Sequence, residues 1–289
     1  MDTEKCKALL VTLETGSLSA AAEQLGYTPS GISRMMAALE QEVGFPLLAR
    51  SRAGVTPTQS CIRMLPVIRE LAQWGERFSQ LSAEINGLKT GVITVGTAYG
   101  IYYGWLSKLI ASFSSQYPGI KVCILEGTSS ELSRAMDEMR ADFCIISQRE
   151  GLHDWIPIRN DELMAWLPLT HPMAAAGKFP LEAFSVEPFI DIYPGQETDN
   201  STAFKRNGII PNTRFTTIDI NAAQALVEAG LGDSLVNGLI AEHWGGRVVK
   251  LPLDPPQTVE IGIAVPEKSA LSPAAKYFLE FAMDRISDL

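Results

Sequence analysis

Hydroxyl, amide and aromatic side chains stand where several expected strands end in residues 90–289. Carboxyl ends of strands that meet at one edge of a sheet form a cleft, and helix N-termini in that cleft favour an anion or carboxylate. The candidate ligand-binding residues are Thr97, Ala98, Tyr99, Thr128, Ser129, Ser147, Tyr193 and Asn237. They predict a site for a small polar molecule. Ordinary helix capping is the competing explanation for each hydroxyl taken alone.

Motifs that would place a nucleophile, a metal or a phosphate for catalysis are missing from the sequence. There is no GxSxG, HExxH or P-loop lysine motif, and Gly91, Gly96 and Gly100 lack the GxGxxG spacing of dinucleotide sites. The four cysteines form no CxxC pair and none pairs with a histidine at zinc-binding spacing. We therefore expect no enzyme activity, no cofactor and no metal.

The first 58 residues have the pattern of three short helices and a turn. Apolar residues repeat at helical spacing over 6–13, and an alanine-rich segment follows the capping residue Ser17. Thr28 and Pro29 predict the start of a third helix, because the hydroxyl caps a free N–H and proline forfeits only an N–H without a partner. A tight turn at Gly26 joins the second and third helices, which predicts a helix-turn-helix.

The third helix opens with small, hydrogen-bonding side chains that allow close approach to a base edge in a DNA groove. These residues are Ser30, Gly31, Ser33 and Arg34. Arg50 and Arg52 follow in a short turn, where we expect a basic wing. The local pattern leaves open a small helical bundle with a polar face.

One long helix with an apolar seam is expected over residues 58–89. The seam residues are spaced 4, 3, 4, 3, 4 and 3 positions apart: Val67, Leu71, Trp74, Phe78, Leu81, Ile85 and Leu88. That spacing is typical of a coiled coil, so we predict that the helix pairs with a second copy of the chain. Packing of the seam on its own domain is the alternative.

Strands and helices alternate over residues 90–289. Strands 92–96, 121–126 and 143–147 with helices 104–115 and 129–139 form a βαβαβ unit, which predicts a parallel sheet. A second set begins at strand 163–168 and includes strands 188–192, 213–217, 234–237, 247–250 and 259–265, helices 200–207, 220–229 and 238–244, and a closing helix at 273–286. We expect two lobes, 90–160 with 266–289 and 161–265, with the chain crossing near 158–161 and 265–266.

The acidic balance is uneven along the chain. The 289 residues carry a net charge of −9, which taken alone argues against a nucleic-acid partner. Residues 1–89 hold nine basic and nine acidic side chains, however, so all excess acid lies in 90–289. DNA affinity would then come from a few well-placed arginines, doubled by dimerisation. No apolar run is long enough to span a membrane and no secretory signal pattern opens the chain, so we expect a cytoplasmic protein.

The first domain resembles the winged helix-turn-helix of LysR-type transcriptional regulators. The resemblance rests on GSLSAAAEQL at 16–25 and on Ser33, Arg34, Leu39, Glu40, Gly44, Leu47 and Arg50. The long helix is similar to the linker helix of that family. Phe113 with YPGI at 117–120, and VEAGLG at 227–232, look like two motifs of its regulatory domain.

This resemblance implies the fold class α + α/β: a winged helix-turn-helix over 1–58, a coiled-coil linker over 59–89 and a two-lobed effector domain, like periplasmic binding proteins, over 90–289. It also implies a bacterial homo-oligomer, a dimer or tetramer, that binds promoter DNA and responds to a small molecule in the cleft. RNA polymerase is a further implied partner, and the effector is a carboxylate or another polar metabolite. A solute-binding protein without a DNA function is the alternative.

Carried over by position, the family's DNA contacts fall on Thr28, Pro29, Ser30, Gly31, Ser33 and Arg34, with Arg50 and Arg52 on phosphates. The effector residues of the family fall on the strand ends already named. Two positions depart from the family pattern on the reading helix. Pro29 stands where glutamine is common and Ser30 where proline is, so a side chain that bonds adenine bidentately is lost and the operator sequence does not carry over. Asn237 stands where proline is usual and adds a donor and an acceptor, which favours a polar effector.

Overall fold

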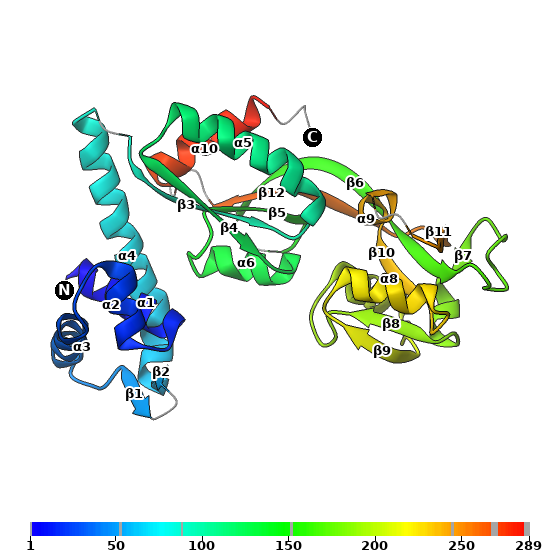
Figure 1. The fold of residues 1–289 in the computed structure, drawn as a ribbon, viewed down its shortest axis with the longest axis horizontal. Helices are drawn as coiled ribbons and strands as arrows, with labels where there is room; N and C mark the ends of the chain where they lie inside the picture. The colour runs from blue at the N-terminus through cyan, green and yellow to red at the C-terminus, as the bar shows by residue number, and fades with distance from the viewer. Residues whose placement is uncertain are drawn as a thin grey trace. The chain divides into compact units, whose positions relative to one another are not determined.

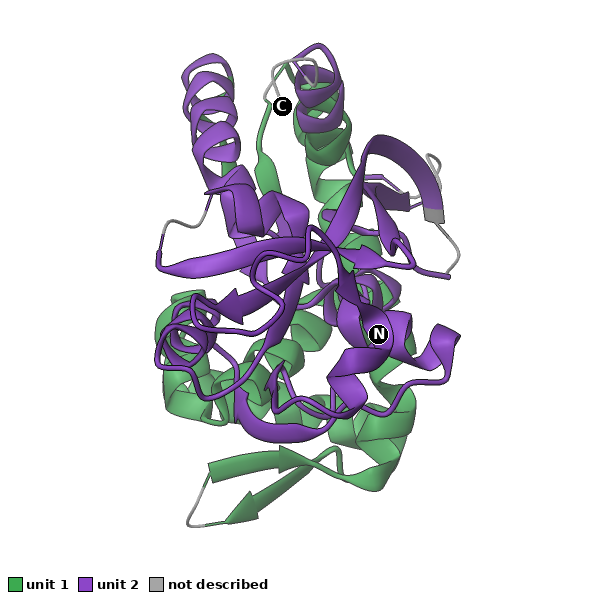
Figure 2. Cartoon of the chain, turned by 90° about the vertical axis from the view of Figure 1, so that its right-hand side faces the viewer, with its two compact units in different colours: residues 1–92, 117–121, 272–277 green, residues 93–116, 122–271, 278–289 purple. Residues whose placement is uncertain are grey.

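The structure is a computed structural model that describes residues 2–51, 54–87, 89–150, 153–243, 246–266 and 271–285. Its contacts divide the chain into two compact units (Figure 2). Unit 1 comprises 1–92, 117–121 and 272–277, and unit 2 comprises 93–116, 122–271 and 278–289. Among the described helices, none combines the length and the apolar character that a bilayer crossing requires.

Unit 1 begins with three helices, α1 (Thr3–Thr15), α2 (Leu18–Leu25) and α3 (Pro29–Val43) (Figure 1). The residues that end and begin these helices are those that the sequence predicts. Gly16 ends α1 in the left-handed conformation at φ 63°, and the Ser17 hydroxyl accepts a hydrogen bond from the N–H of Ala20 at the start of α2. The three helices enclose a small core that includes Leu9, Ile32 and Leu39.

A β-hairpin follows α3, formed by β1 (Leu48–Ser51) and β2 (Gly54–Pro57). The Glu40 carboxylate holds its start by accepting from the N–H groups of Leu47 and Leu48 at 2.7 and 3.0 Å. At its other end Gly54, at φ 126°, lies so close to Gly16 that a Cβ atom would stand 2.7 Å from the Gly16 carbonyl oxygen. The hairpin is therefore fixed to helices on both sides.

Helix α4 (Gln59–Ile85) is the long helix that the seam predicts, although it ends four residues earlier than expected. The Thr58 hydroxyl caps it by accepting from the N–H of Cys61. One face packs on α1. On the same unit the Gln80 side chain, only 3% exposed, accepts from the N–H of Ala274 at 3.2 Å.

Most strands of unit 2 form one sheet with the order β4-β3-β5-β12-β6-β11-β7, with β10 paired to β6. These strands are β3 (Gly91–Thr97), β4 (Ile120–Glu126), β5 (Phe143–Ser147), β6 (His153–Pro168), β7 (Phe179–Pro180), β10 (Ser234–Asn237), β11 (Val248–Asp254) and β12 (Thr258–Pro266). A second, parallel pair consists of β8 (Phe189–Ile192) and β9 (Thr213–Thr217). The helical elements are η1 (Gly100–Tyr102), α5 (Tyr103–Gln116), α6 (Ser129–Asp137), η2 (Leu181–Ser185), α7 (Asp199–Asn207), α8 (Ile220–Glu228), α9 (Gly238–His243) and α10 (Pro273–Met283).

The expectation of a parallel sheet needs correction. Strands β3 and β5 are parallel as predicted, but β12 runs antiparallel to both β5 and β6, so the sheet is mixed. The reason is that β12 enters the first lobe from the second and so runs opposite to the βαβαβ strands. The segment 158–161, where we expect the chain to cross between the lobes, lies in the middle of the 16-residue strand β6. The two lobes are joined by the paired strands β6 and β12 (Figure 1).

Each lobe has its own aromatic core. In the first, the rings of Phe113 and Phe278 have centroids 4.8 Å apart. In the second, Phe184 packs on Phe189 and Phe204 with centroids 5.3 and 5.5 Å apart. Each lobe therefore has a core of its own. The polar residues at the strand ends between the two cores are available to form a binding site.

Candidate functional site

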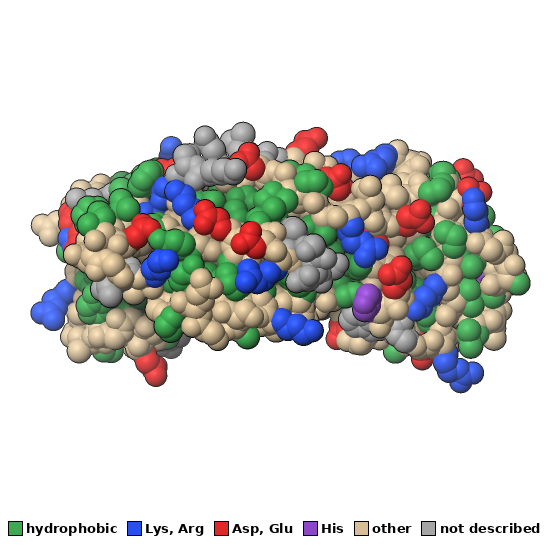
Figure 3. Space-filling model, turned by 90° about the horizontal axis from the view of Figure 1, so that it is seen from above, with side chains coloured by type: hydrophobic (Ala, Val, Ile, Leu, Met, Phe, Trp, Pro, Cys, Tyr) green, Lys and Arg blue, Asp and Glu red, His purple; other side chains and the backbone are tan. Residues whose placement is uncertain are grey.

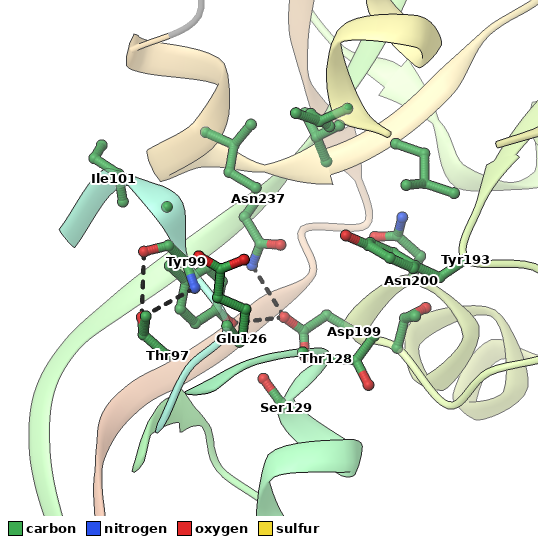
Figure 4. A pocket seen from close by; sticks show the side chains of 18 of the residues that line it. Thr97, Tyr99, Ile101, Glu126, Thr128, Ser129, Tyr193, Asp199, Asn200 and Asn237 are labelled. Atoms are coloured by element: carbon green, nitrogen blue, oxygen red, sulfur yellow. Dashed lines mark hydrogen bonds between the residues drawn. The ribbon is translucent and has the colours of Figure 1, made fainter. Parts of the chain in front are cut away.

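A cavity of about 260 Å³ lies where strand ends of both lobes meet (Figure 4). The structure brings seven of the eight predicted effector residues to its wall: Thr97, Ala98, Tyr99, Thr128, Ser129, Tyr193 and Asn237. The eighth, Ser147, is 1% exposed and lies behind the wall, where its hydroxyl is 3.0 Å from that of Ser129. Residues that are separated by up to 140 positions in the sequence thus share one cavity.

Asp199, the first residue of α7, is a lining residue that the sequence reasoning missed. Its carboxylate accepts four hydrogen bonds. Oδ1 accepts from the Ser147 hydroxyl at 2.5 Å and the Arg149 guanidinium at 2.8 Å. Oδ2 accepts from the Tyr99 hydroxyl at 2.9 Å and the Asn237 amide at 3.1 Å, the two bonds that dashed lines mark in Figure 4. A carboxylate offers about four lone-pair positions, so this one has no free capacity to accept.

Arg149 was missed as well, although its side chain is the only cation among the described residues that line the cavity. Besides Asp199, its guanidinium donates to the hydroxyls of Ser130 at 2.9 Å and Ser147 at 2.7 Å. The side chains of Arg149 and Asp199 are 13% and 8% exposed, so their ion pair is nearly buried. In the sequence Asp199 looks like an ordinary acidic first turn of a helix. Only the fold places it beside Arg149, 50 residues away.

Three tyrosines surround the polar centre. Burial, and then the charge of Asp199, raises the pKa of Tyr99 well above its ordinary value. Burial and a hydrogen bond with Glu126 raise the pKa of Tyr103 to about 12. Tyr193 is 39% exposed and adopts φ 63°, which is uncommon for a residue other than glycine. Its pKa is raised by burial and then by the charges of Glu131, Asp219 and Glu126.

The wall also has an apolar part. It consists of Ile101, Ile192, Ile220, Leu235, Val236 and Ile240. A concave site that combines apolar side chains with convergent polar groups is typical of small-molecule binding. The arrangement can enclose a small ligand.

The predicted DNA-reading residues lie together at the N-terminus of α3. Thr28, Pro29, Ser30 and Arg34 are exposed, and Gly31 and Ser33 are half-buried. The Thr28 hydroxyl caps the helix by accepting from the N–H of Gly31 at 3.1 Å. Arg50 is exposed on β1, whereas Arg52 lies outside the described residues. On the molecular face in Figure 3, basic and acidic side chains are interspersed and form no single large basic patch.

The α4 seam is mostly uncovered in the single chain. Of its described members Val67, Trp74, Phe78, Leu81 and Ile85 are exposed, with 76% for Phe78 and 78% for Ile85. Leu71 instead packs, partly buried, against the core of the three N-terminal helices, and Leu88 lies outside the described residues. The pairing predicted for this face therefore depends on five exposed apolar side chains.

Comparison with known families accounts for both parts of the chain. Residues 3–61 match the bacterial regulatory helix-turn-helix protein, lysR family, and residues 86–287 match the LysR substrate binding domain. The chain belongs to the LysR family. Curated LysR-type relatives include the uncharacterized HTH-type transcriptional regulator YvbU of Bacillus subtilis (strain 168), 28% identical over 98% of both chains. The HTH-type transcriptional regulator TtuA of Agrobacterium vitis is 25% identical over 82% of this chain and 80% of its own.

Solved structures of LysR regulators share the fold. Full-length OxyR from Pseudomonas aeruginosa superposes with a TM-score of 0.73 at 19% identity, over 99% of this chain and 94% of its own. CbnR, a LysR family transcriptional regulator, gives 0.62 at 20% identity over 98% and 99%. CbnR has also been solved in complex with its target DNA. The predicted family and fold class are therefore confirmed: this is a LysR-type transcriptional regulator with an N-terminal helix-turn-helix and a two-lobed α/β effector-binding domain.

Proposed function

We propose that this LysR-family chain is a ligand-responsive regulator that reads a specific promoter sequence. A small molecule enters the cavity between the lobes and alters DNA binding or promoter activation. The observation that carries this proposal is the joint presence, in one chain, of a LysR helix-turn-helix and a cavity built from seven predicted strand-end residues. Residues 1–58 would read DNA, 59–89 would dimerise and 90–289 would bind the effector, in the cytoplasm.

Within this proposal the exposed start of α3 lies in the major groove. Ser30, Ser33 and Arg34 would contact base edges, since short side chains let the helix backbone come close. Arg50 on β1, together with Arg52, would contact phosphates, which position the protein but carry no sequence information. Pairing through the α4 seam would double these few contacts and give two half-sites.

The test is a gel-shift titration of the full-length protein with the DNA upstream of its own gene, at several salt concentrations. We expect a sequence-selective shift that weakens as salt rises, because phosphate contacts release counterions. Unrelated DNA of the same length is the control. Equal affinity for both DNAs, or no shift at low salt, would contradict the proposal.

A further inference from the structure

Three helices that begin at the cavity, α6, α7 and α8, already have carboxylates of the chain's own at their N-termini. At α6 the Glu131 carboxylate accepts from the N–H and the hydroxyl of Thr128 at 2.9 and 3.2 Å. Asp199 is the first residue of α7. At α8 the Asp219 carboxylate accepts from the N–H of Asn221 at 2.7 Å. The positive ends of these helix dipoles, which would favour a bound anion, are therefore already compensated.

The side chains best suited to hold a carboxylate ligand are also engaged. Arg149, Tyr99, Ser147 and Asn237 all donate to Asp199. A ligand carboxylate at this position would have to displace a nearly buried ion pair, which leaves two buried carboxylates near one guanidinium. Two such like charges cannot both be accommodated at low cost. Asp199 thus stands where an anionic ligand would bind.

The rest of the cavity wall consists of apolar residues, polar side chains such as those of Thr198 and Asn200, and one further carboxylate, that of Glu126. Glu126 lines the cavity and is exposed, so its carboxylate can receive a partner. Glu131 and Asp219 lie near enough to Tyr193, with Glu126, for their charges to raise the pKa of that tyrosine. Since Arg149 is paired with Asp199, the described lining residues offer no further cation against this acidic field. Aromatic faces such as those of Tyr103 and Tyr193 also attract cations.

We propose that Asp199 is a resident anion of the effector cavity, and that the cavity accepts a small organic ammonium ion with an apolar body. The ammonium group would lie at Glu126 between Tyr103 and Tyr193, and the apolar body would pack on the isoleucines of the wall. This inference rests on the proposed function, because it names the chemical class of the effector. It replaces the carboxylate option that the helix N-termini favour in the sequence.

Matched pairs of probes test the ligand class. Primary ammonium ions of graded size (methyl-, butyl-, cyclohexyl- and benzylammonium) are compared with carboxylates of the same carbon frameworks, at equal ionic strength, in thermal unfolding of the full-length protein. We expect at least one of the larger ammonium ions to raise Tm and the carboxylates to have no effect, since stabilisation follows occupancy of the folded state. Glu126→Gln should weaken that binding by roughly 2- to 5-fold, as for an exposed ion pair. Stabilisation by carboxylates, or by none of the ammonium ions, would overturn the proposed ligand class.

Chemical rescue tests the resident anion separately. Asp199→Ala leaves four donors without an acceptor, so sodium acetate should raise the Tm of this variant by about 3 °C more than equal sodium chloride does. The wild type and Asp199→Asn, in which the space stays filled, should show no such difference. If Asp199→Ala does not fold, Asp199→Ser supplies the same test with a smaller loss of volume. An equal response to acetate in the wild type and the shortened variants would overturn the role of Asp199.

These results can be separated from the proposed function. Both measurements use the folded chain without DNA, so a negative outcome leaves sequence-selective DNA binding untouched. If acetate rescues Asp199→Ala as expected but the protein gives no gel shift, the proposed regulator function is refuted and the role of Asp199 is not. If the proposed function is correct, the ammonium ion that raises Tm should also change the gel-shift midpoint on the upstream DNA.

Discussion

The start of α3 and the effector cavity use polar residues in opposite ways. On α3 the side chains of Ser30 and Arg34 are exposed, and their hydrogen bonds lie within the same helical turn. In the cavity Asp199 and Arg149 are nearly buried and bond to groups from distant segments. The polar groups on α3 can therefore still form hydrogen bonds with a partner, whereas most of those in the cavity already bond to other groups of the protein.

The two regions also differ in charge. Residues 1–89 are neutral overall and residues 90–289 carry the net charge of −9. A neutral reading domain avoids repelling DNA, while an acidic effector domain adds no general attraction to it. We expect substitutions on α3 and α4 to change association while leaving folding intact, and substitutions at the buried charges of unit 2 to change folding itself.

The largest effect is expected from Arg149→Ala. The substitution leaves the Asp199 carboxylate buried without its cation, and breaking a buried pair in this way costs about 3–5 kcal/mol. Urea unfolding measures the loss. Arg140→Ala is the matched control, because Arg140 pairs with Glu138 at a more exposed site and should lose at most about 1 kcal/mol. Adding Asp199→Asn to Arg149→Ala should restore part of the stability. Equal losses of unfolding free energy for Arg149→Ala and Arg140→Ala would show that the buried ion pair contributes no more to stability than the surface pair.

The next effect concerns association through α4. Leu81→Asp puts a charge on the exposed seam and should weaken dimers by about 2–4 kcal/mol, because a carboxylate would be desolvated in an apolar interface. Sedimentation velocity over a concentration series measures the change. Ser82→Asp, one residue off the seam, is the control and should sediment as the wild type does. If Leu81→Asp forms dimers as the wild type does, the α4 seam does not mediate dimerisation.

The sequence alone predicts the start of α3 better than it predicts the centre of the cavity, because the first depends on local contacts and the second on contacts between distant segments. The α3 surface depends on caps and turns set by residues within three or four positions, such as Ser17 with Ala20 or Thr28 with Gly31. Local contacts of this kind can be predicted without the fold, so α2 and α3 begin directly after the expected caps Ser17 and Thr28. The seven lining residues at strand ends were predictable in the same way, because each lies at or just after the end of a strand.

The centre of the cavity was not predictable by that reasoning. Asp199 opens a helix, and its role comes from Tyr99, 100 residues away, and from Arg149, which follows β5. The mixed sheet was missed for a similar reason, since β12 reaches β5 only after the chain has built the second lobe. Local spacing contains no information about such pairings between distant segments.

A third prediction concerns pH and the second lobe. Burial, and then the charge of Glu187, raises the pKa of Asp233 to about 7. The imidazole Nε2 of His171 lies 3.5 Å from this carboxylate, too far for a strong hydrogen bond, so burial dominates. A raised carboxyl pKa favours the protonated form in the folded state, and stability falls as pH rises from the unfolded pKa of about 4 to about 7. Asp233→Asn removes this dependence.

The measurement for this third prediction is urea unfolding of the wild type and Asp233→Asn at pH 5, 6 and 7. The stability of the variant relative to the wild type should rise by about 2 kcal/mol over this range. Asp219→Asn is the control, because the pKa of Asp219 is lowered by its bond to Asn221 and that group stays charged throughout. A constant difference from pH 5 to pH 7 would show that Asp233 does not titrate in the folded state.

The smallest effect is expected at the reading surface itself. Ser33→Ala removes one hydroxyl from half-buried Ser33 on α3. If that hydroxyl bonds a base edge, specific binding should weaken by about 1 kcal/mol while binding to unrelated DNA stays the same. Competition gel shifts with the upstream DNA and an unrelated fragment measure the ratio of the two affinities. Folding should be unaffected, in contrast to Arg149→Ala.

Arg50→Ala separates base reading from phosphate contact on the same domain. Arg50 is exposed on β1, and loss of a phosphate contact should weaken both DNAs alike and lower the salt slope by about one. The two variants should therefore be complementary: Ser33→Ala changes the specificity ratio at constant salt slope, and Arg50→Ala changes the slope at a constant ratio. If Ser33→Ala leaves the ratio unchanged, the hydroxyl does not read a base, and specificity must come from Ser30 and Arg34 at the start of the helix or from the shape of the DNA.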